Sequence, residues 1–195
     1  IILFSGGMDT QFKDIKPVLW QGIALSTVGV LLTTLFTGLF IFWISGFNFT
    51  PIYMPLATSL LLAATMSSTD SASVFNILRS QKIQLKYNIK STLELESGSN
   101  DPMAYMLTIA LIQYITSASL GIGSVIWSFI MQFAIGGLVG FIIGKVAVHL
   151  INRMHLSIPS LYSLMLLSLI FFTFAITDII GGNGYLAVYI AGIIV

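Results

Sequence analysis

Charged residues are absent from two long stretches of the chain, one between Lys16 and Asp70 and the other between Asp101 and Lys145. A helix that crosses a bilayer needs about 20 mostly apolar residues, so each stretch has room for two such helices. Turn-forming residues divide both stretches, at 46–51 and at 117–121. The pattern therefore predicts five complete membrane spans, at about 17–45, 51–78, 91–118, 123–150 and 159–178.

Apolar segments at the two ends of the chain predict two further, incomplete spans. Residues 1–4 have the pattern of the end of one span, and residues 185–195 have that of the beginning of another. The chain lacks an initiator Met and the layout of charged, apolar and small residues of a signal peptide. We therefore expect residues 1–195 to be an internal fragment of one larger transmembrane domain, truncated at both ends.

The composition supports this interpretation and excludes other classes of protein. Of the 195 residues, 56% are hydrophobic and only 8% are charged, whereas a soluble domain carries roughly 25% charged residues. Disordered chains are poor in apolar residues, and a net charge of +1 offers no electrostatic surface for nucleic acid. The absence of cysteine excludes disulfides and thiolate chemistry. The sequence predicts an all-α polytopic membrane protein whose surroundings are the lipid bilayer.

The basic residues predict the orientation of the spans. If the connections alternate between the two sides, one side receives 9–16, 79–90 and 151–158, and the other receives loops without Lys or Arg. Because cytoplasmic loops are rich in Lys and Arg, the first side is expected to be cytoplasmic. The residues on that side are Lys13, Lys16, Arg79, Lys82, Lys86, Lys90 and Arg153.

Asp70, Glu96 and Asp101 are the acids that this topology places inside the membrane. At 1.5 Å per residue, Asp101 lies about 15 Å and Asp70 about 12 Å from the cytoplasmic edge of their antiparallel spans. A carboxylate at the bilayer centre costs about 2.5–3.5 kcal/mol, so such residues usually face a cavity, a partner or an ion path. We expect the two aspartates to share one site.

The polar run from Thr65 to Ser73 predicts a discontinuous helix near residues 66–71, with Asp70 or Ser71 capping a second half. Unwound backbone is tolerated in a membrane only where it is buried in protein or lines a cavity. The alternative is an intact helix whose Ser and Thr hydroxyls bond back to its own carbonyls.

The next span carries a second polar cluster, at residues 96–102. Ser97, Asn100 and Asp101 share one helical face. Pro102 has no N–H for the carbonyl of Gly98, which is left free nearby. Oxygen atoms of these kinds suit a dehydrated monovalent cation, although a buried packing network would use the same residues.

Four segments of the chain are distinctive: FSGGMDT at 4–10, STDSASVF at 68–75, ELESGSNDP at 94–102 and GYLAVYIAG at 184–192. They resemble the sodium/proton exchanger family of monovalent cation:proton antiporters, most specifically its bacterial potassium/proton antiporters linked to cell-volume regulation. The resemblance implies an inverted-repeat antiporter fold with crossed, broken helices, a homodimer, and a place in the cell inner membrane.

The resemblance also implies the roles of individual residues. Asp101 would be the essential acid that carries the ion and the proton, with Thr69 contributing mainly its backbone carbonyl beside Asp70. Glu96, Ser97 and Asn100 would complete the ion site, in which the cation contacts Asp101, Ser97 and Thr69. The neutral Asn100 resembles the electroneutral branch of the family. No cofactor and no enzymatic activity are implied.

The function expected from these residues is secondary exchange of K⁺ or Na⁺ for protons, serving pH and volume homeostasis. Asp101 would bind either a proton or a cation, never both. A passive cation channel is one alternative. An intramembrane aspartyl protease with Asp70 and Asp101 as its dyad is another, although Asn100 stands where such proteases typically have glycine. A serine protease that pairs Ser97 or Ser99 with His149 is less favoured, since His149 lies near the membrane edge.

Overall fold

The computed structural model describes residues 1–9, 12–47, 52–70, 73–74, 76–77, 88–116, 121–154, 158 and 160–195, and every regular element that they form is helical. Two short irregular helices, the 3₁₀ helix η1 (Lys16–Val18) and the π helix η2 (Leu25–Gly29), flank α3. The α-helices are α1 (Ile2–Asp9), α2 (Phe12–Ile15), α3 (Leu19–Ala24), α4 (Val30–Ser45), α5 (Leu56–Thr65), α7 (Ile89–Thr116), α8 (Ile122–Arg153), α9 (Ser160–Ile179) and α10 (Gly184–Ile194).

Helices lie along four of the five expected spans, and the fifth differs. The span expected at 51–78 is helical from Leu56 to Thr65; residues 52–55 precede it and 66–70 follow it without helix, and residues 73–74 and 76–77 are helical again. At the N-terminus, α1 continues to Asp9 instead of ending near Phe4. Ser71, Arg79, Lys82, Lys86 and most of the loop expected at 117–121 lie outside the described residues.

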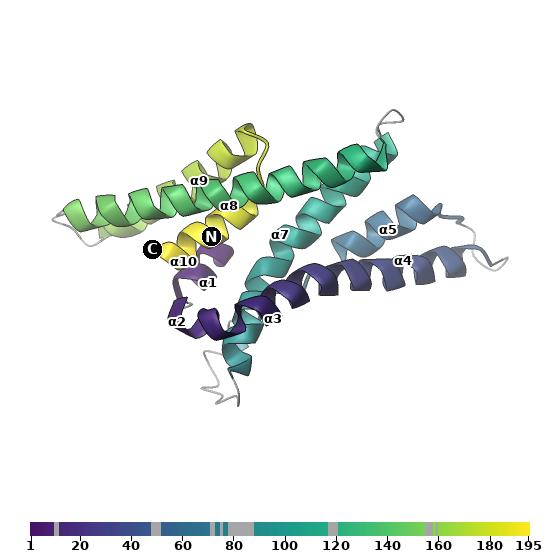
Figure 1. The fold of residues 1–195 in the computed structure, drawn as a ribbon, viewed down its shortest axis with the longest axis horizontal. Coiled ribbons are helices and arrows are strands. Elements are labelled where there is room, and N and C mark those ends of the chain that lie inside the picture. The colour runs from purple at the N-terminus through teal and green to yellow at the C-terminus, as the bar shows by residue number, and fades with distance from the viewer. Residues whose placement is uncertain are drawn as a thin grey trace.

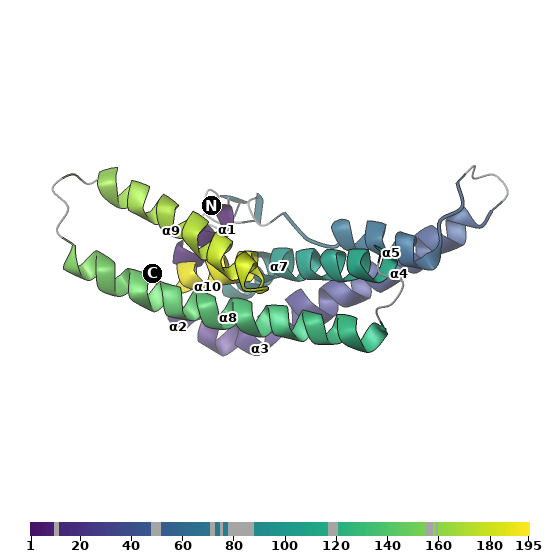
Figure 2. The ribbon, with the colours of Figure 1, turned by 90° about the horizontal axis from the view of Figure 1, so that it is seen from above.

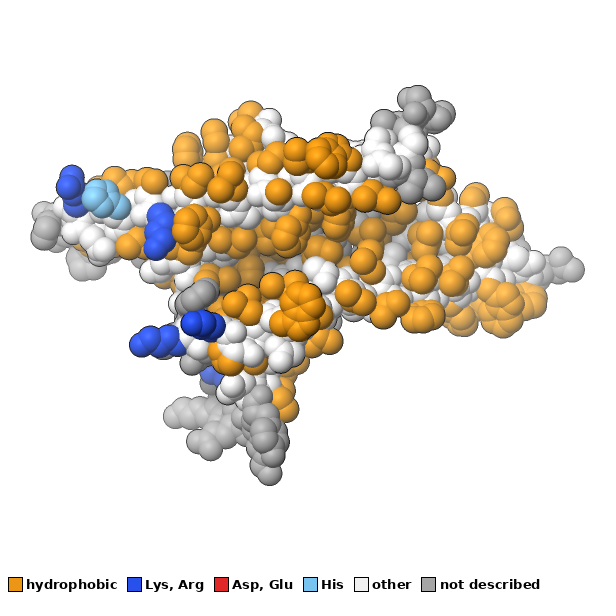
Figure 3. All heavy atoms as spheres, in the orientation of Figure 1, with side chains coloured by type: hydrophobic (Ala, Val, Ile, Leu, Met, Phe, Trp, Pro, Cys, Tyr) orange, Lys and Arg blue, Asp and Glu red, His pale blue; other side chains and the backbone are white. Residues whose placement is uncertain are grey.

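Three helical segments of the described chain are long and apolar enough to cross a membrane: Lys16–Ser45, Gly123–Arg153 and Ser160–Ile179. Much of their apolar surface faces outward, with Trp20, Trp43 and Trp127 each more than 60% exposed. On the face drawn in Figure 3, hydrophobic side chains cover most of the surface, and the Lys and Arg side chains gather toward one end. This distribution is that of a multi-pass membrane protein.

The helix α7 occupies the middle of the assembly. It runs diagonally between α8 on one side and α3, α4 and α5 on the other, while α1 and α10 fill the space beside its N-terminal half (Figure 1). Seen from above, the molecule is elongated, and the C-terminal ends of α4 and α8 point in opposite directions (Figure 2). Because α7 touches all of these helices, its polar residues lie inside the assembly.

One buried stripe joins the helix at 16–45 to its neighbours. Its members recur every four residues: Val18, Gly22, Ser26, Val30, Thr34 and Gly38. A four-residue repeat drifts by about 40° per step around an ideal α-helix. The wider turn of η2 takes up part of this drift, so that Gly22 contacts Leu95 of α7 and Gly38 contacts Leu60 of α5.

Glycines bring the helices of the other half into backbone contact. Gly136, Gly140 and Gly144 of α8 recur every four residues and lie against α10 and its N-cap Asn183, as small residues do where two helices pack closely. Gly7 of α1 meets the backbone at Tyr189, and Gly192 of α10 meets the backbone at Phe4. These contacts explain why α1 continues through two glycines: a side chain at Gly7 would push α10 away.

Substituting Gly140 tests this close contact. A Cβ atom at Gly140 would lie 2.5 Å from the carbonyl oxygen of Ala187, which is backbone and cannot rotate away. We expect Gly140→Ala to lower the free energy of unfolding of the full-length protein by about 1–3 kcal/mol. The loss should appear as a lower midpoint temperature of thermal unfolding in detergent. The matched control is Gly137→Ala, where the nearest atom is 3.9 Å away. Equal midpoints for the two variants would contradict the close packing of α8 on α10.

Candidate functional site

The candidate site is built around Pro102, which lies inside α7. Because proline lacks an N–H, the carbonyl of Gly98 receives no helical hydrogen bond from it. Ser97, Gly98, Asn100 and Pro102 are all buried at this turn. The polar residues of the two turns therefore face neighbouring segments of the protein.

The non-helical segment 66–70 lies beside this turn. Ser67 is buried, and its hydroxyl donates to the carbonyl of Ala64 at 2.8 Å, which closes the end of α5. The hydroxyl of Ser68 donates to Oδ1 of Asp101 and also lies 3.3 Å from Oδ1 of Asn100. Since one hydroxyl carries one proton, the charged carboxylate is the stronger acceptor of the two.

Asn100 links the segment 66–70 to α7. Its side chain is 1% exposed, and its amide nitrogen donates to Oγ1 of Thr69 and, at 3.1 Å, to Oε1 of Glu96. These two bonds use both amide protons. Glu96 also accepts a hydrogen bond from the hydroxyl of Ser97 at 3.2 Å through its other oxygen. A continuous network thus runs from Ser97 through Glu96 and Asn100 to Thr69.

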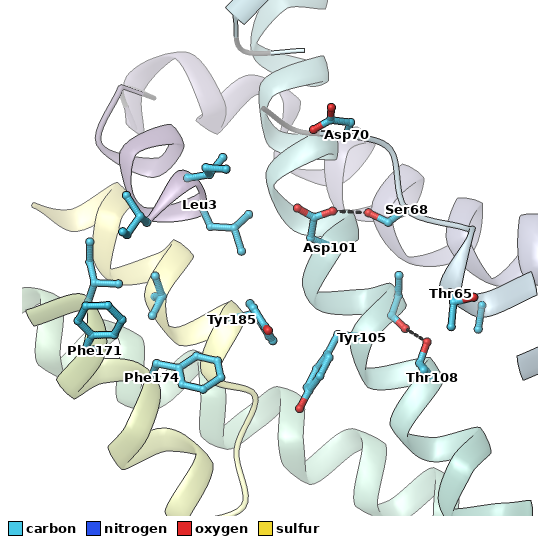
Figure 4. Close-up of a pocket in the computed structure, with 16 residues that line it drawn as sticks. Leu3, Thr65, Ser68, Asp70, Asp101, Tyr105, Thr108, Phe171, Phe174 and Tyr185 are labelled. Atoms are coloured by element: carbon cyan, nitrogen blue, oxygen red, sulfur yellow. Dashed lines mark hydrogen bonds between the residues drawn. The ribbon is translucent and has the colours of Figure 1, made fainter. Parts of the chain in front are cut away.

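Asp70 lies where the chain becomes helical again. Its backbone carbonyl accepts the N–H of Val74 at 3.1 Å, and its carboxylate accepts the hydroxyl of Ser73. Asp70 is exposed, and in Figure 4 its carboxylate lies above the bonded pair of Asp101 and Ser68. These contacts are those of a residue that begins a helix.

Asp70 and Asp101 both line a cavity of about 840 Å³. One wall is a single face of α7, formed by Asp101, Ala104, Tyr105 and Thr108 at helical spacing. The opposite wall comes from α1, α9 and α10. Its polar end holds Ser68 and the two aspartates, and its other end is aromatic (Figure 4).

The aromatic end of the cavity is a cluster of three rings. The centroids of Tyr105 and Tyr185 are 4.8 Å apart, and those of Phe174 and Tyr185 are 5.0 Å apart, both with edge-to-face geometry. Asp101 and Tyr105 are one turn apart on α7. The cluster therefore lies directly beyond the carboxylate, along the same face.

The residues that the sequence singles out take different places around the cavity. Asp70 and Asp101 line it. Asn100, Thr69 and Glu96 are not among its lining residues, and hydrogen bonds join Asn100 to both of the others. Ser97, expected to contact a cation, is 1% exposed and donates to Glu96. In the part of the chain that the structure describes, no cluster of three His, Asp or Glu side chains has the arrangement of a metal site.

Sequence reasoning did not single out Ser68 and Asn183. Ser68 belongs to the polar run beside Asp70, but its partners lie 32 and 33 residues away, so only the fold brings them together. Asn183 caps α10 by accepting the N–H of Leu186 at 2.9 Å. An Asn directly before an apolar helical run is a helix-start signal that could have identified it.

Comparison with known proteins gives a consistent assignment. The family model "Sodium/hydrogen exchanger, transmembrane" matches residues 1–195. The K(+)/H(+) antiporter NhaP of Alkalimonas amylolytica is 41% identical over 192 residues, which is 98% of this chain and 32% of that protein. The K(+)/H(+) antiporter NhaP2 of Shewanella sp. (strain ANA-3) is 36% identical over 195 residues, which is 99% of this chain and 32% of that protein.

A third relative matches only part of the chain. The Na(+)/H(+) antiporter NhaH of Halobacillus aidingensis is 40% identical over 98 residues, which is 48% of this chain and 24% of that protein. The chain spans about a third of the length of the two K(+)/H(+) antiporters that it matches along almost its whole length.

Proposed function

The chain belongs to the transmembrane sodium/hydrogen exchanger family, and from that premise we propose that the full-length protein exchanges a monovalent cation for protons across the cytoplasmic membrane. The observation that carries the proposal is the environment of Asp101. Its carboxylate lines the cavity and is bonded to Ser68, and the neutral amide of Asn100 lies beside it. The family is one of transporters, which sets aside the two protease interpretations.

The proposed mechanism is competition for one carboxylate. The oxygens of Asp101 accept either a proton or a dehydrated cation, and the second cannot bind while the first is present. The hydroxyl of Ser68, the backbone carbonyl of Thr69 and the carboxylate of Asp70 are the nearby oxygen atoms that would replace water around the cation. Ser97 and Glu96 would act indirectly: Ser97 donates to Glu96, and Glu96 holds the amide of Asn100 in place.

The neutrality of Asn100 supports an exchange of one cation for one proton. Both of its amide protons are engaged, with Thr69 and Glu96, so its orientation is fixed. A site that releases one unit charge for each one that it accepts moves no net charge in a cycle. We therefore propose electroneutral exchange.

The relatives support K⁺ as the first cation to test. The two that match 98–99% of this chain are named K(+)/H(+) antiporters, whereas the one named a Na(+)/H(+) antiporter matches 48% of it. We further propose that α5 and the helical residues 73–74 and 76–77 belong to two halves of one discontinuous span in an inverted-repeat fold, and that the protein works as a homodimer. The end of α5 at Thr65 and the non-helical residues 66–70 support the break.

Removing the charge of Asp101 tests the mechanism. In everted membrane vesicles that contain the full-length protein, adding K⁺ or Na⁺ should dissipate an imposed proton gradient, measured with a pH-sensitive dye. Asp101→Asn should abolish this response, because an amide binds neither a proton nor a cation with comparable affinity. The control is Asp178→Asn, an exposed acid near the end of α9 that should keep the wild-type response.

Wild-type exchange in the Asp101→Asn variant would refute the assignment of the carboxylate. A passive channel would carry the cation without coupling it to protons. Proteoliposomes given a K⁺ gradient, with the membrane potential clamped, would then build no proton gradient.

Replacing Ser68 tests the bond that crosses from the non-helical segment to α7. Ser68→Ala removes the donor to the carboxylate of Asp101 and one oxygen atom at the cavity. We expect the cation concentration for half-maximal exchange to rise about tenfold or more, since a bond to a charged group contributes about 1.5–3 kcal/mol and about 1.4 kcal/mol corresponds to tenfold. Ser168→Ala is the control, because that exposed hydroxyl donates only to Leu164 of its own helix. An unchanged half-maximal concentration in Ser68→Ala would exclude Ser68 from the site.

A further inference from the structure

Asn183 joins three helices at the level of the candidate site. Its side chain is 1% exposed, its Nδ2 donates to the carbonyl of Pro102 on α7 at 3.0 Å, and its Oδ1 accepts the N–H of Leu186 on α10. Its own backbone N–H donates to the carbonyl of Gln132 on α8 at 3.0 Å. One buried residue thus fixes the relative position of α7, α8 and α10.

The carbonyl that Asn183 binds belongs to the residue that follows Asp101. At this turn Pro102 deprives α7 of one backbone hydrogen bond, so the helix is held less firmly by its own bonds than elsewhere. A bond from outside the helix restrains the turn at that place. In an apolar surrounding, such an interhelical bond has little competition from water.

The approach of Asn183 to α7 depends on its neighbours. Gly181 has a φ of +78°, a conformation that other residues rarely adopt, and the N–H of Gly182 donates to the carbonyl of Thr177 at 2.8 Å. A Cβ atom at Gly182 would lie 2.6 Å from Ile135, and one at Gly136 would lie 2.7 Å from the carbonyl oxygen of Asn183. The turn at residues 181–183 is therefore in close contact with α8, and no space remains there for a larger side chain.

A second contact holds α7 on the other side of Asp101. The ring of Tyr189, which is 1% exposed, lies so close to Gly98 that a Cβ atom there would be 2.4 Å from it. Gly98 precedes Asp101 by three residues, and Pro102 follows it directly. The helix α10 thus contacts α7 on both sides of the aspartate.

From these contacts we propose that Asn183 is a positioning residue, which sets the rotation and depth of α7 so that the carboxylate of Asp101 faces Ser68 and the cavity. An amide suits this role because one side chain must accept the N–H of Leu186 and donate to the carbonyl of Pro102. The proposal rests on the proposed function, in which Asp101 binds the transported cation.

The test separates the cap of α10 from the bond to Pro102. Asn183→Ser and Asn183→Thr both keep a hydroxyl oxygen that can cap α10, and neither keeps the amide N–H that reaches Pro102. In everted vesicles of the full-length protein, each variant should raise the K⁺ concentration for half-maximal exchange about three- to tenfold. The maximal rate per protein molecule should stay within about twofold of the wild-type rate. Asn152→Ser, an exposed site near the end of α8, should change neither quantity.

A second measurement does not depend on transport. The rate at which a hydrophobic carbodiimide modifies Asp101 reports how that carboxyl group faces the cavity. It should change several-fold in both Asn183 variants, while the modification of Asp178 stays at the wild-type rate. Asn183→Thr is closer in size to Asn183 than Asn183→Ser is, so it serves if Asn183→Ser fails to fold.

The outcomes distinguish this proposal from the proposed function. If both variants keep the wild-type half-maximal concentration and the wild-type labelling rate, or lose only the amount of folded protein, the positioning role is wrong. If the wild-type protein shows no exchange at all, the proposed function fails, and the labelling rates alone decide the role of Asn183.

Discussion

Residues 66–70 are not helical and lie beside α7, in a molecule whose outer surface is mostly apolar. Their polar groups need hydrogen-bond partners inside the protein, and the site depends on this constraint. Backbone without helical bonds persists at membrane depth only where protein groups or a lined cavity satisfy it. Here the end of α5 is closed by the hydroxyl of Ser67, and Ser68 and Thr69 bond to side chains of α7. The polar residues of α7 are thus required by the neighbouring break as much as by any ligand.

The apolar framework complements this polar centre. The helix at 16–45 packs on α7 and α5 through one narrow stripe, and α8, α10 and α1 meet through glycines. Small residues let the backbones approach so closely that van der Waals contact replaces the hydrophobic effect, which is weak between helices in lipid. As a result, the outward faces remain free to be mostly apolar, as those of α4 and α8 are.

The positions of most helices, and of the polar residues within them, could be predicted from the sequence because they follow from local pattern. Asp101 and Asn100 stand out as polar residues within an apolar span, and they follow Ser97 by four and three residues, the spacings that place all three on one helical face. Within the expected span 51–78 the helix begins only at Leu56. Pro55 before it has an extended ψ of 153°, and a residue before proline avoids the helical conformation. The bonds of Ser68, Thr69 and Asn183 connect residues 31 to 81 positions apart, and no local pattern specifies such pairs.

The π helix at Leu25–Gly29 affects how this segment tolerates changes in length. A π turn is equivalent to one residue inserted into an α-helix, and it lies between the halves of the stripe that contact Leu95 and Leu60. Deleting one residue elsewhere in 19–45 would rotate one half of the stripe by about 100° relative to the other. Deleting one residue within 25–29 could instead be absorbed by conversion of the π turn into α-helix. One localised turn, which packs against α7, therefore lets this segment lose a residue without losing the alignment of its two contact surfaces.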